Sequence, residues 1–163
     1  MIDNVDKQVI KKSYNWQIDL SPSATRLIRG DDGLLRFDYV DHTQSGHNVI
    51  TTAGIQEIVN LMTGSGSAFT HFAVGSGSTS ASSGQTALVT EQARATFTNE
   101  IISTDRVTWQ YLLPATASNG VTLSEAGVFN DASAGTMLNR YTHTSFTKNS
   151  GIQALYTVVL TIS

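Results

Sequence analysis

Four short patterns in this chain contain residue types that occur in active sites or binding sites. Ser145 and Lys148 have the S-x-x-K spacing of serine enzymes in which a lysine activates the nucleophile. Residues 74–80 are rich in glycine, as phosphate-binding loops are, and residues 29–31 spell the Arg-Gly-Asp tripeptide of cell-adhesion ligands. Four side chains offer imidazole nitrogens that can bind a metal: His42, His47, His71 and His143.

The sequence around each pattern argues against that chemistry. An S-x-x-K serine must begin a helix, whereas Ser145 lies in a Thr-rich run that predicts a strand. Residues 74–80 have Ser80 at the third glycine position and no Walker-type lysine, so we interpret them as the start of a strand-to-strand loop that is flexible over residues 76–84. Residues 29–31 are interpreted as a polar turn.

The histidines are not spaced as metal ligands, and the chain contains no cysteine. We therefore predict no metal site, no cofactor site and no catalytic residues, and we expect a protein that is not an enzyme. His143 lies within a Thr-rich strand, where we predict a cross-strand contact.

Glu125 is the one carboxylate whose position is unusual, because Ser124, Ala126 and Gly127 place it inside an otherwise apolar strand. A carboxylate buried there must find hydrogen-bond donors, since burying it without them would cost several kcal/mol. Backbone amides at a turn, or Arg94 or Arg140, are the candidate donors. We predict a structural, hydrogen-bonded Glu125.

The composition favours β structure. Ser and Thr supply 39 of the 163 residues, whereas charged residues make up only 14% of the chain. The net charge of −3 has the wrong sign for a nucleic-acid-binding domain. No apolar run approaches the roughly 18 residues of a membrane span, and the first residues lack the layout of a secretion signal. We therefore expect no nucleic-acid partner, no membrane partner, and synthesis in the cytoplasm.

One helix is expected, over residues 52–62. Ile55, Ile58, Val59 and Met62 follow the i, i+3, i+4, i+7 spacing of an amphipathic helix. Thr51 or Thr52 can cap its start, and Gly64 can close its end. The apolar stripe predicts that this face packs against the sheets.

Short apolar runs separated by Gly, Ser and Asn clusters predict at least six strands after the helix. They cover residues 70–74, 93–103, 106–113, 121–129, 136–146 and 152–162. Strands at this spacing, with no helices between them, predict a mainly β fold: an antiparallel β-sandwich, jelly-roll-like, with one short α-helix and an extended N-terminal arm.

Charge density divides the chain into two parts. Residues 1–50 hold 13 charged residues, whereas the remaining 113 residues hold 10. We therefore predict an N-terminal arm or small β subdomain over residues 1–46 and a β-sandwich core domain over residues 47–163. Within the arm, residues 14–20 and 34–40 read as two strands that form a hairpin.

Three segments in this order, residues 70–77, 123–130 and 135–140, resemble a β-rich structural module of tailed-bacteriophage virion proteins. That module is found in and around tail fibres, baseplates and similar appendages. The helix-bearing entry at residues 48–54 resembles the usual start of the module, and the resemblance covers about residues 47–163. Residues 1–46 match nothing comparable.

The resemblance implies a non-enzymatic structural component of a tailed-phage virion, located in the tail, baseplate or fibre-attachment region. It implies that Gly75, Gly77 and Gly127 are fold determinants and that Glu125 is a buried polar anchor. The expected partners are other copies of the chain, in a ring or trimer, and other virion proteins, contacted through the N-terminal arm. A host-surface receptor is a further candidate partner.

Two alternatives remain open at this point. One is a capsid decoration or cement protein on the phage head, which has the same size and all-β character. The other is a receptor-binding or carbohydrate-binding module, for which five aromatic side chains could supply stacking faces: Trp16, Trp109, Tyr39, Tyr111 and Tyr141.

Overall fold

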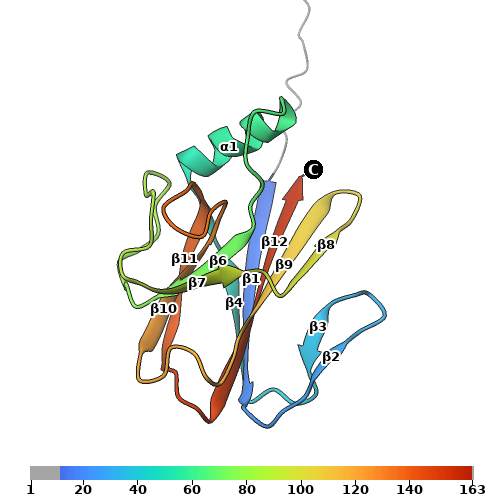
Figure 1. The fold of residues 1–163 in the computed structure, drawn as a ribbon, viewed down its shortest axis with the longest axis vertical. Coiled ribbons are helices and arrows are strands. Elements are labelled where there is room, and N and C mark those ends of the chain that lie inside the picture. Colours follow the sequence, from blue (N-terminus) through green and yellow to red (C-terminus); the bar gives the residue numbers. More distant parts are fainter. Residues whose placement is uncertain (1–11, 163) are drawn as a thin grey trace, which may run out of the picture.

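Two five-stranded antiparallel sheets pack face to face in the computed structural model, which describes residues 12–162 (Figure 1). The first sheet has the spatial order β4 (His42–His47), β1 (Lys12–Pro22), β12 (Ile152–Ile162), β9 (Arg106–Leu113) and β8 (Asn99–Ile102). The second has the order β5 (Val49–Ile50), β11 (Met137–Thr147), β10 (Thr122–Phe129), β6 (His71–Gly75) and β7 (Glu91–Thr96). The predicted mainly β sandwich with one short helix is confirmed.

The first strand corrects the predicted division of the chain. β1 lies between β12 and β4 and pairs with β12 over eleven residue pairs, from Lys12 with Ile162 to Pro22 with Ile152. The alternation seen in the sequence places Trp16 and Ile18 in the core between the sheets. The segments of β1 and β4, which were predicted to lie outside the core domain, are therefore strands of the sandwich, and residues 1–11 lie outside the described residues.

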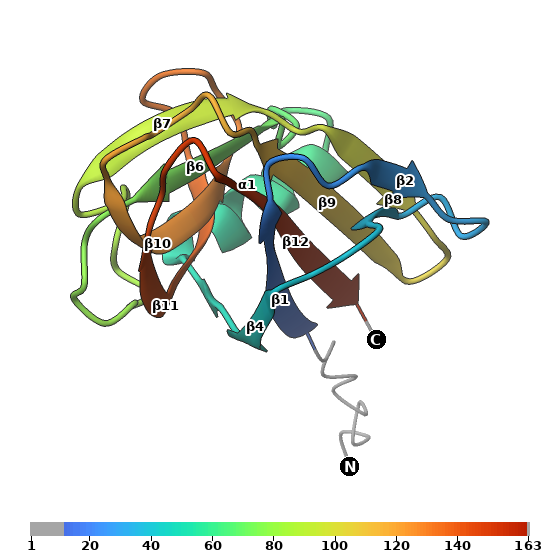
Figure 2. The same ribbon diagram turned by 90° about the horizontal axis from the view of Figure 1, so that it is seen from below.

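The predicted hairpin between residues 14–20 and 34–40 is wrong for the same reason, because both edges of β1 are already occupied. The second segment forms β3 (Leu35–Phe37), which instead pairs with β2 (Leu27–Arg29). This small hairpin packs on the outer face of the first sheet, where Leu35 and Phe37 form a cluster with Leu155. Figure 2 shows the two sheets and the hairpin from below.

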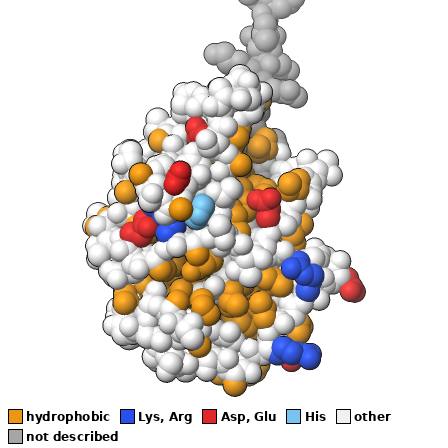
Figure 3. All heavy atoms as spheres, viewed as in Figure 1, with side chains coloured by type: hydrophobic (Ala, Val, Ile, Leu, Met, Phe, Trp, Pro, Cys, Tyr) orange, Lys and Arg blue, Asp and Glu red, His pale blue; other side chains and the backbone are white. Residues whose placement is uncertain are grey.

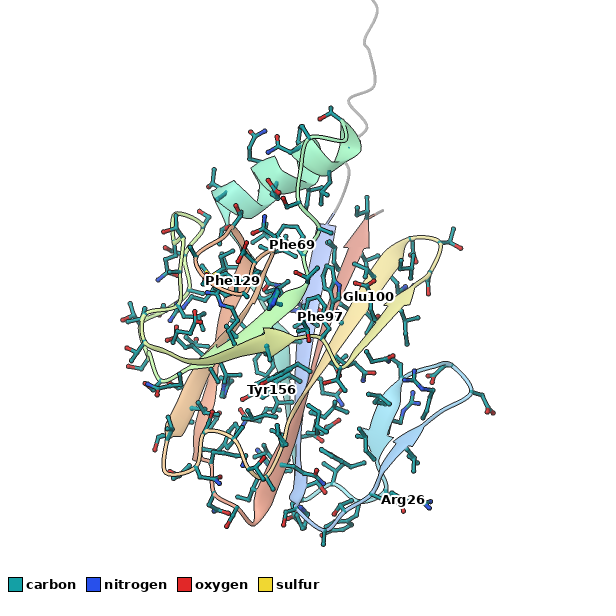
Figure 4. The ribbon with its side chains drawn as sticks, viewed as in Figure 1. Arg26, Phe69, Phe97, Glu100, Phe129 and Tyr156 are labelled. Atoms are coloured by element: carbon teal, nitrogen blue, oxygen red, sulfur yellow. The ribbon has the colours of Figure 1, made fainter. Side chains whose placement is uncertain are left out.

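The two sheets are connected at both sides by very short corners. Asn48 alone separates β4 from β5, and residues 97–98 alone separate β7 from β8. The predicted strand over residues 93–103 is therefore two strands in different sheets. Phe97, labelled in Figure 4, lies in the second corner and stacks on Trp109 with ring centroids 5.5 Å apart.

Aromatic rings fill much of the space between the sheets. Trp16 of the first sheet stacks on Tyr141 of the second, with ring centroids 4.8 Å apart. Phe72 lies 5.2 Å from both Tyr111 and Tyr156, measured between ring centroids. These pairs join the two sheets across the core.

The helix α1 (Thr52–Met62) has the predicted bounds and caps. The Thr51 hydroxyl accepts a hydrogen bond from the Gly54 amide at 2.8 Å, and Gly64 closes the helix with a φ of +74°. The prediction for its packing face is wrong. Gly54 lies against the backbone of β11, so close that an added Cβ would be 2.4 Å from the Leu138 carbonyl oxygen.

The close approach at Gly54 rotates most of the predicted apolar stripe away from the sheets. Ile58 is half-buried and packs on the core. Ile55, Val59 and Met62 are instead 40%, 48% and 80% exposed. The helix thus presents an apolar surface outward.

Candidate interaction surface

Glu125 anchors a long loop, residues 76–90, to the outer face of the second sheet. Its carboxylate accepts hydrogen bonds from the amides of Gly77, Thr90 and Val89 at 2.8 to 3.0 Å and from Nε of Arg140 at 2.8 Å. Both side chains of the Glu125 and Arg140 ion pair are fully buried. Burial alone would raise the pKa of Glu125, but these hydrogen bonds outweigh it and lower the pKa below its ordinary value. The predicted role of Glu125 is confirmed.

The segment predicted to be flexible, residues 76–84, is held at both of its ends by hydrogen bonds to the rest of the molecule. Besides the contacts at Gly77, the Ser83 carbonyl accepts a hydrogen bond from the Thr52 amide at 2.8 Å, and Gln85 accepts one from Arg140 at 3.1 Å. Leu88 of the same loop is buried against the outer face of the sheet in a cluster with three other side chains: Ala73, Phe129 and Met137. The loop therefore covers apolar surface.

The three glycines that the resemblance singles out lie at close approaches of the backbone. A Cβ on Gly75 or Gly77 would lie 2.6 or 2.5 Å from Oε1 of Glu125. A Cβ on Gly127 would lie 2.6 Å from the Asn139 carbonyl oxygen. None of the three has a positive φ. Glycine is required there because an added Cβ would overlap with neighbouring atoms.

The S-x-x-K pair does not form a nucleophile and its base. Lys148 is fully buried, and its ammonium donates to the Ala115 carbonyl, the Asn119 side chain and the Asn149 carbonyl at 2.9 to 3.2 Å. Burial lowers the pKa of Lys148. Ser145 is exposed on β11. The lysine instead holds the loop between β9 and β10 closed.

The histidines are not brought together. His42 and His47 lie on β4, His71 on β6 and His143 on β11, and within residues 12–162 no three His, Asp or Glu side chains gather as a metal site. The ring of His143 lies near Trp16 of the other sheet, at 6.3 Å between ring centroids, and burial lowers its pKa. It therefore belongs to the core between the sheets.

The aromatic residues considered for stacking a ligand are mostly buried. Trp16, Trp109, Tyr111 and Tyr141 are at most 7% exposed, whereas Tyr39 is 59% exposed. A shallow depression of about 360 Å³ lies beside Trp16 on the first sheet, lined mainly by small and polar residues: Asn15, Gln17, Ser45, Gly46, His47, Thr157 and Val159. The Trp16 ring stacks on Tyr141 of the second sheet, so the depression offers little aromatic surface.

The Arg-Gly-Asp tripeptide lies in the turn of the β2 and β3 hairpin, as predicted for a polar turn. Gly33, with a φ of +79°, donates its amide to the Gly30 carbonyl at 2.9 Å. The Arg29 guanidinium donates to the Gly33 carbonyl at 2.7 Å and to the Asn99 side chain at 2.8 Å. The arginine is thus occupied by contacts within the molecule.

Exposed apolar side chains gather at one end of the sandwich. This end, which we name the apical end, carries α1, the turn between β8 and β9, and the last residues of β12 (Figure 1). Among the described residues, eight large hydrophobic side chains are exposed, and six of them lie there: Ile55, Val59, Leu61, Met62, Ile102 and Ile162. Figure 3 shows hydrophobic side chains on the viewed face below the helix and, over a larger area, across the middle and lower part of that face. The concentration of exposed large hydrophobic side chains at the apical end is typical of an interaction surface.

A continuous apolar shelf lies on the first sheet at this end. It consists of four residues and is named the apical shelf: Ile102, Val107, Leu160 and Ile162. Val107 pairs with both Ile102 and Leu160, so the three share the inward face of the sheet, and Ile162 follows two residues later on the same face. The shelf lines a depression of about 390 Å³. Leu160 is 6% exposed, but Ile102 is 78% and Ile162 is 46% exposed. The inward face of the first sheet therefore extends beyond the part that the rest of the sandwich buries.

Comparisons with known proteins found no match, whether with family models, curated proteins or solved structures. The described residues contain one helix, which is eleven residues long. This helix is not long and apolar enough to cross a membrane.

The apical shelf was not singled out from the sequence, although part of its signal was visible. Ile162 continues the alternation of β12, and Ile102 lies directly before the polar turn of residues 103–105. Alternation identifies the core face of a strand, but it does not show where the opposite sheet stops covering that face.

Proposed function

We propose that this chain is a non-enzymatic structural component of a tailed-bacteriophage virion. Its proposed location is the tail, baseplate or fibre-attachment region. It acts by assembling with copies of itself and with other virion proteins. The observation that carries the proposal is the apolar apical end, where exposed side chains such as Met62 and Ile102 leave surface for a partner. The sequence resemblance over about residues 47–163 supplies the phage context.

The way polar groups are used supports an assembly role. The buried charges Glu125, Arg140 and Lys148 hold loops in place through hydrogen bonds within the chain. None of the three lines either of the two depressions described above. A scaffold of this kind presents a rigid surface, which lowers the entropy cost of forming a regular assembly.

The assembly proposal is tested by the mass of the purified full chain in solution. Light scattering after size exclusion, across a hundredfold range of protein concentration, should give a defined oligomer such as a trimer or a ring. A monomer at every concentration, with and without other virion proteins, would remove the basis for the proposal.

The proposed location is tested on particles. Gold-labelled antibody against the chain should label the tail or its distal end in negative-stain images of the phage that encodes it. Labelling of the head would favour the capsid decoration alternative, and absence from purified particles would contradict a virion role.

A further inference from the structure

We infer that the apical shelf is the docking site for residues 1–11 of a second copy of this chain. The inference rests on the proposed function and names the contact by which copies assemble. Ile102 and Ile162 of the shelf are exposed beside a depression of about 390 Å³. They lie on the same face of the sheet as Leu160, which is part of the core.

The position at which the described chain begins favours this occupant. Lys12, the first described residue, pairs directly with Ile162 of the shelf. The described chain therefore begins at the apical end, beside the surface that residues 1–11 are inferred to cover in a neighbour. Eleven residues span roughly 17 Å as a helix and up to roughly 36 Å when extended, so either form can reach beyond the end of its own sandwich.

The sequence of residues 1–11 fits an apolar shelf. Ile2, Val5 and Val9 recur at the three- and four-residue spacing that places side chains on one face of a helix, and Asn4 and Gln8 fall between them. A short amphipathic segment bound there would bury this face on the shelf and leave its polar side in water.

The geometry of β1 favours a neighbouring copy over the same chain. Lys12 is part of a regular antiparallel ladder with β12, so the direction of β1 at Lys12 points outward past Ile162. To reach the shelf of its own molecule, the segment would have to turn back toward the sheet from the end of β1. A neighbour's shelf requires no such reversal.

The direct test is a disulfide cross-link, for which the chain is suited because it has no cysteine of its own. The double variant Val9→Cys with Ile102→Cys is oxidised as the full chain, and the linked peptides are identified by mass. We expect a link between positions 9 and 102 in covalent multimers. The same link within a monomer would mean that the segment covers its own shelf, and absence of the link would mean that it docks elsewhere. Either result overturns the inference.

A second test uses matched charge substitutions in the same segment. Val5→Asp with Val9→Asp should weaken self-association at least about tenfold, because each aspartate would have to be buried on the shelf. Asn4→Asp with Gln8→Asp adds the same charge on the polar side and should leave association within about twofold of the unmodified chain. Equal effects of the two variants would contradict docking through the apolar face.

The two proposals fail in different ways. If the unmodified chain is an oligomer but positions 9 and 102 do not link between chains, the docking inference is wrong and the assembly function stands. If the unmodified chain is a monomer at every concentration, the proposed function itself fails.

Discussion

The outer face of the second sheet and the apical end are both apolar surfaces at the margin of the sandwich, but only the first is covered by the described chain. On the outer face, Leu88 of the loop 76–90 is buried with Phe129 and Met137. At the apical end, Met62 and Ile102 remain about four-fifths exposed.

The difference lies in what holds a cover in place. The loop 76–90 contributes few apolar side chains of its own, and it stays on the sheet because the Glu125 carboxylate accepts three of its backbone amides. Beside the shelf, Asp105 and Arg106 pair with each other in exposed positions, so this ion pair is not buried as that of Glu125 and Arg140 is. A buried charge thus closes one apolar surface, and the surface without one stays exposed. Four experiments test this contrast, and their expected effects on folding stability decrease in turn.

Removing the anchor should have the largest effect. Glu125→Ala leaves Arg140 buried without its partner and frees three amides, so we expect a loss of about 3–5 kcal/mol in the free energy of unfolding, measured by denaturant titration. The loop should also become sensitive to proteases. Asp105→Asn, which removes one partner of the exposed Arg106 ion pair, is the control and should cost under about 1 kcal/mol. Equal losses would show that Glu125 is not an anchor.

Filling the space under the loop should have the next largest effect. A Cβ on Gly77 would lie 2.5 Å from both Oε1 of Glu125 and Cβ of Val89, so Gly77→Ala should cost about 1–3 kcal/mol. Gly84 lies in the same loop with no atom within 4 Å of its added Cβ, so Gly84→Ala should be nearly neutral. If both variants unfold at the same denaturant concentration, the loop is not tightly packed on the carboxylate.

Acid should weaken the anchor in a predictable direction. The pKa of Glu125 is lowered in the folded state, so below its ordinary value of 4.5 the unfolded chain binds a proton that the folded chain does not. The stability contributed by Glu125 is present above pH 4.5 and is lost as the pH falls through the folded pKa. The free energy of unfolding is measured against pH for the unmodified chain and for Glu125→Gln. The difference between the two curves should show this loss, and a difference that does not change with pH would contradict it.

Changing the apical end should have the smallest effect on folding. Val59→Ser with Met62→Ser alters two exposed side chains and should change the free energy of unfolding by less than about 0.5 kcal/mol. It should still weaken self-association in sedimentation experiments. Ile58→Ser, on the face of the same helix that packs on the core, should instead cost about 1–2 kcal/mol of folding free energy. If Val59→Ser with Met62→Ser lowers the free energy of unfolding and leaves self-association unchanged, the apical surface contributes to folding and not to association.

Features that depend on local sequence were predicted well. The helix and its bounds followed from spacing over a few residues, its cap was narrowed to Thr51 or Thr52, and β9 and β12 were found with their observed bounds. The anchoring of Glu125 was also predictable, because a carboxylate in an apolar strand must be paired whatever the topology.

Features that depend on distant partners were missed. The loop 76–90 looked flexible because its amides find their acceptor at Glu125, up to 48 residues away. The partner of β1 is not its neighbour in the sequence but β12, the last strand of the described residues. The outward stripe of α1 depends on Gly54 approaching the Leu138 carbonyl, which a helical pattern does not encode.

The pairing of β1 with β12 has a consequence for how the protein is made on the ribosome. The pair Lys12 and Ile162 joins residues at opposite ends of the described chain, so β1 has no partner on that edge until β12 has been synthesised. β4 can pair with β1 early, but closure of the first sheet must wait until β12 leaves the ribosome. Such long-range closure is expected to be slow.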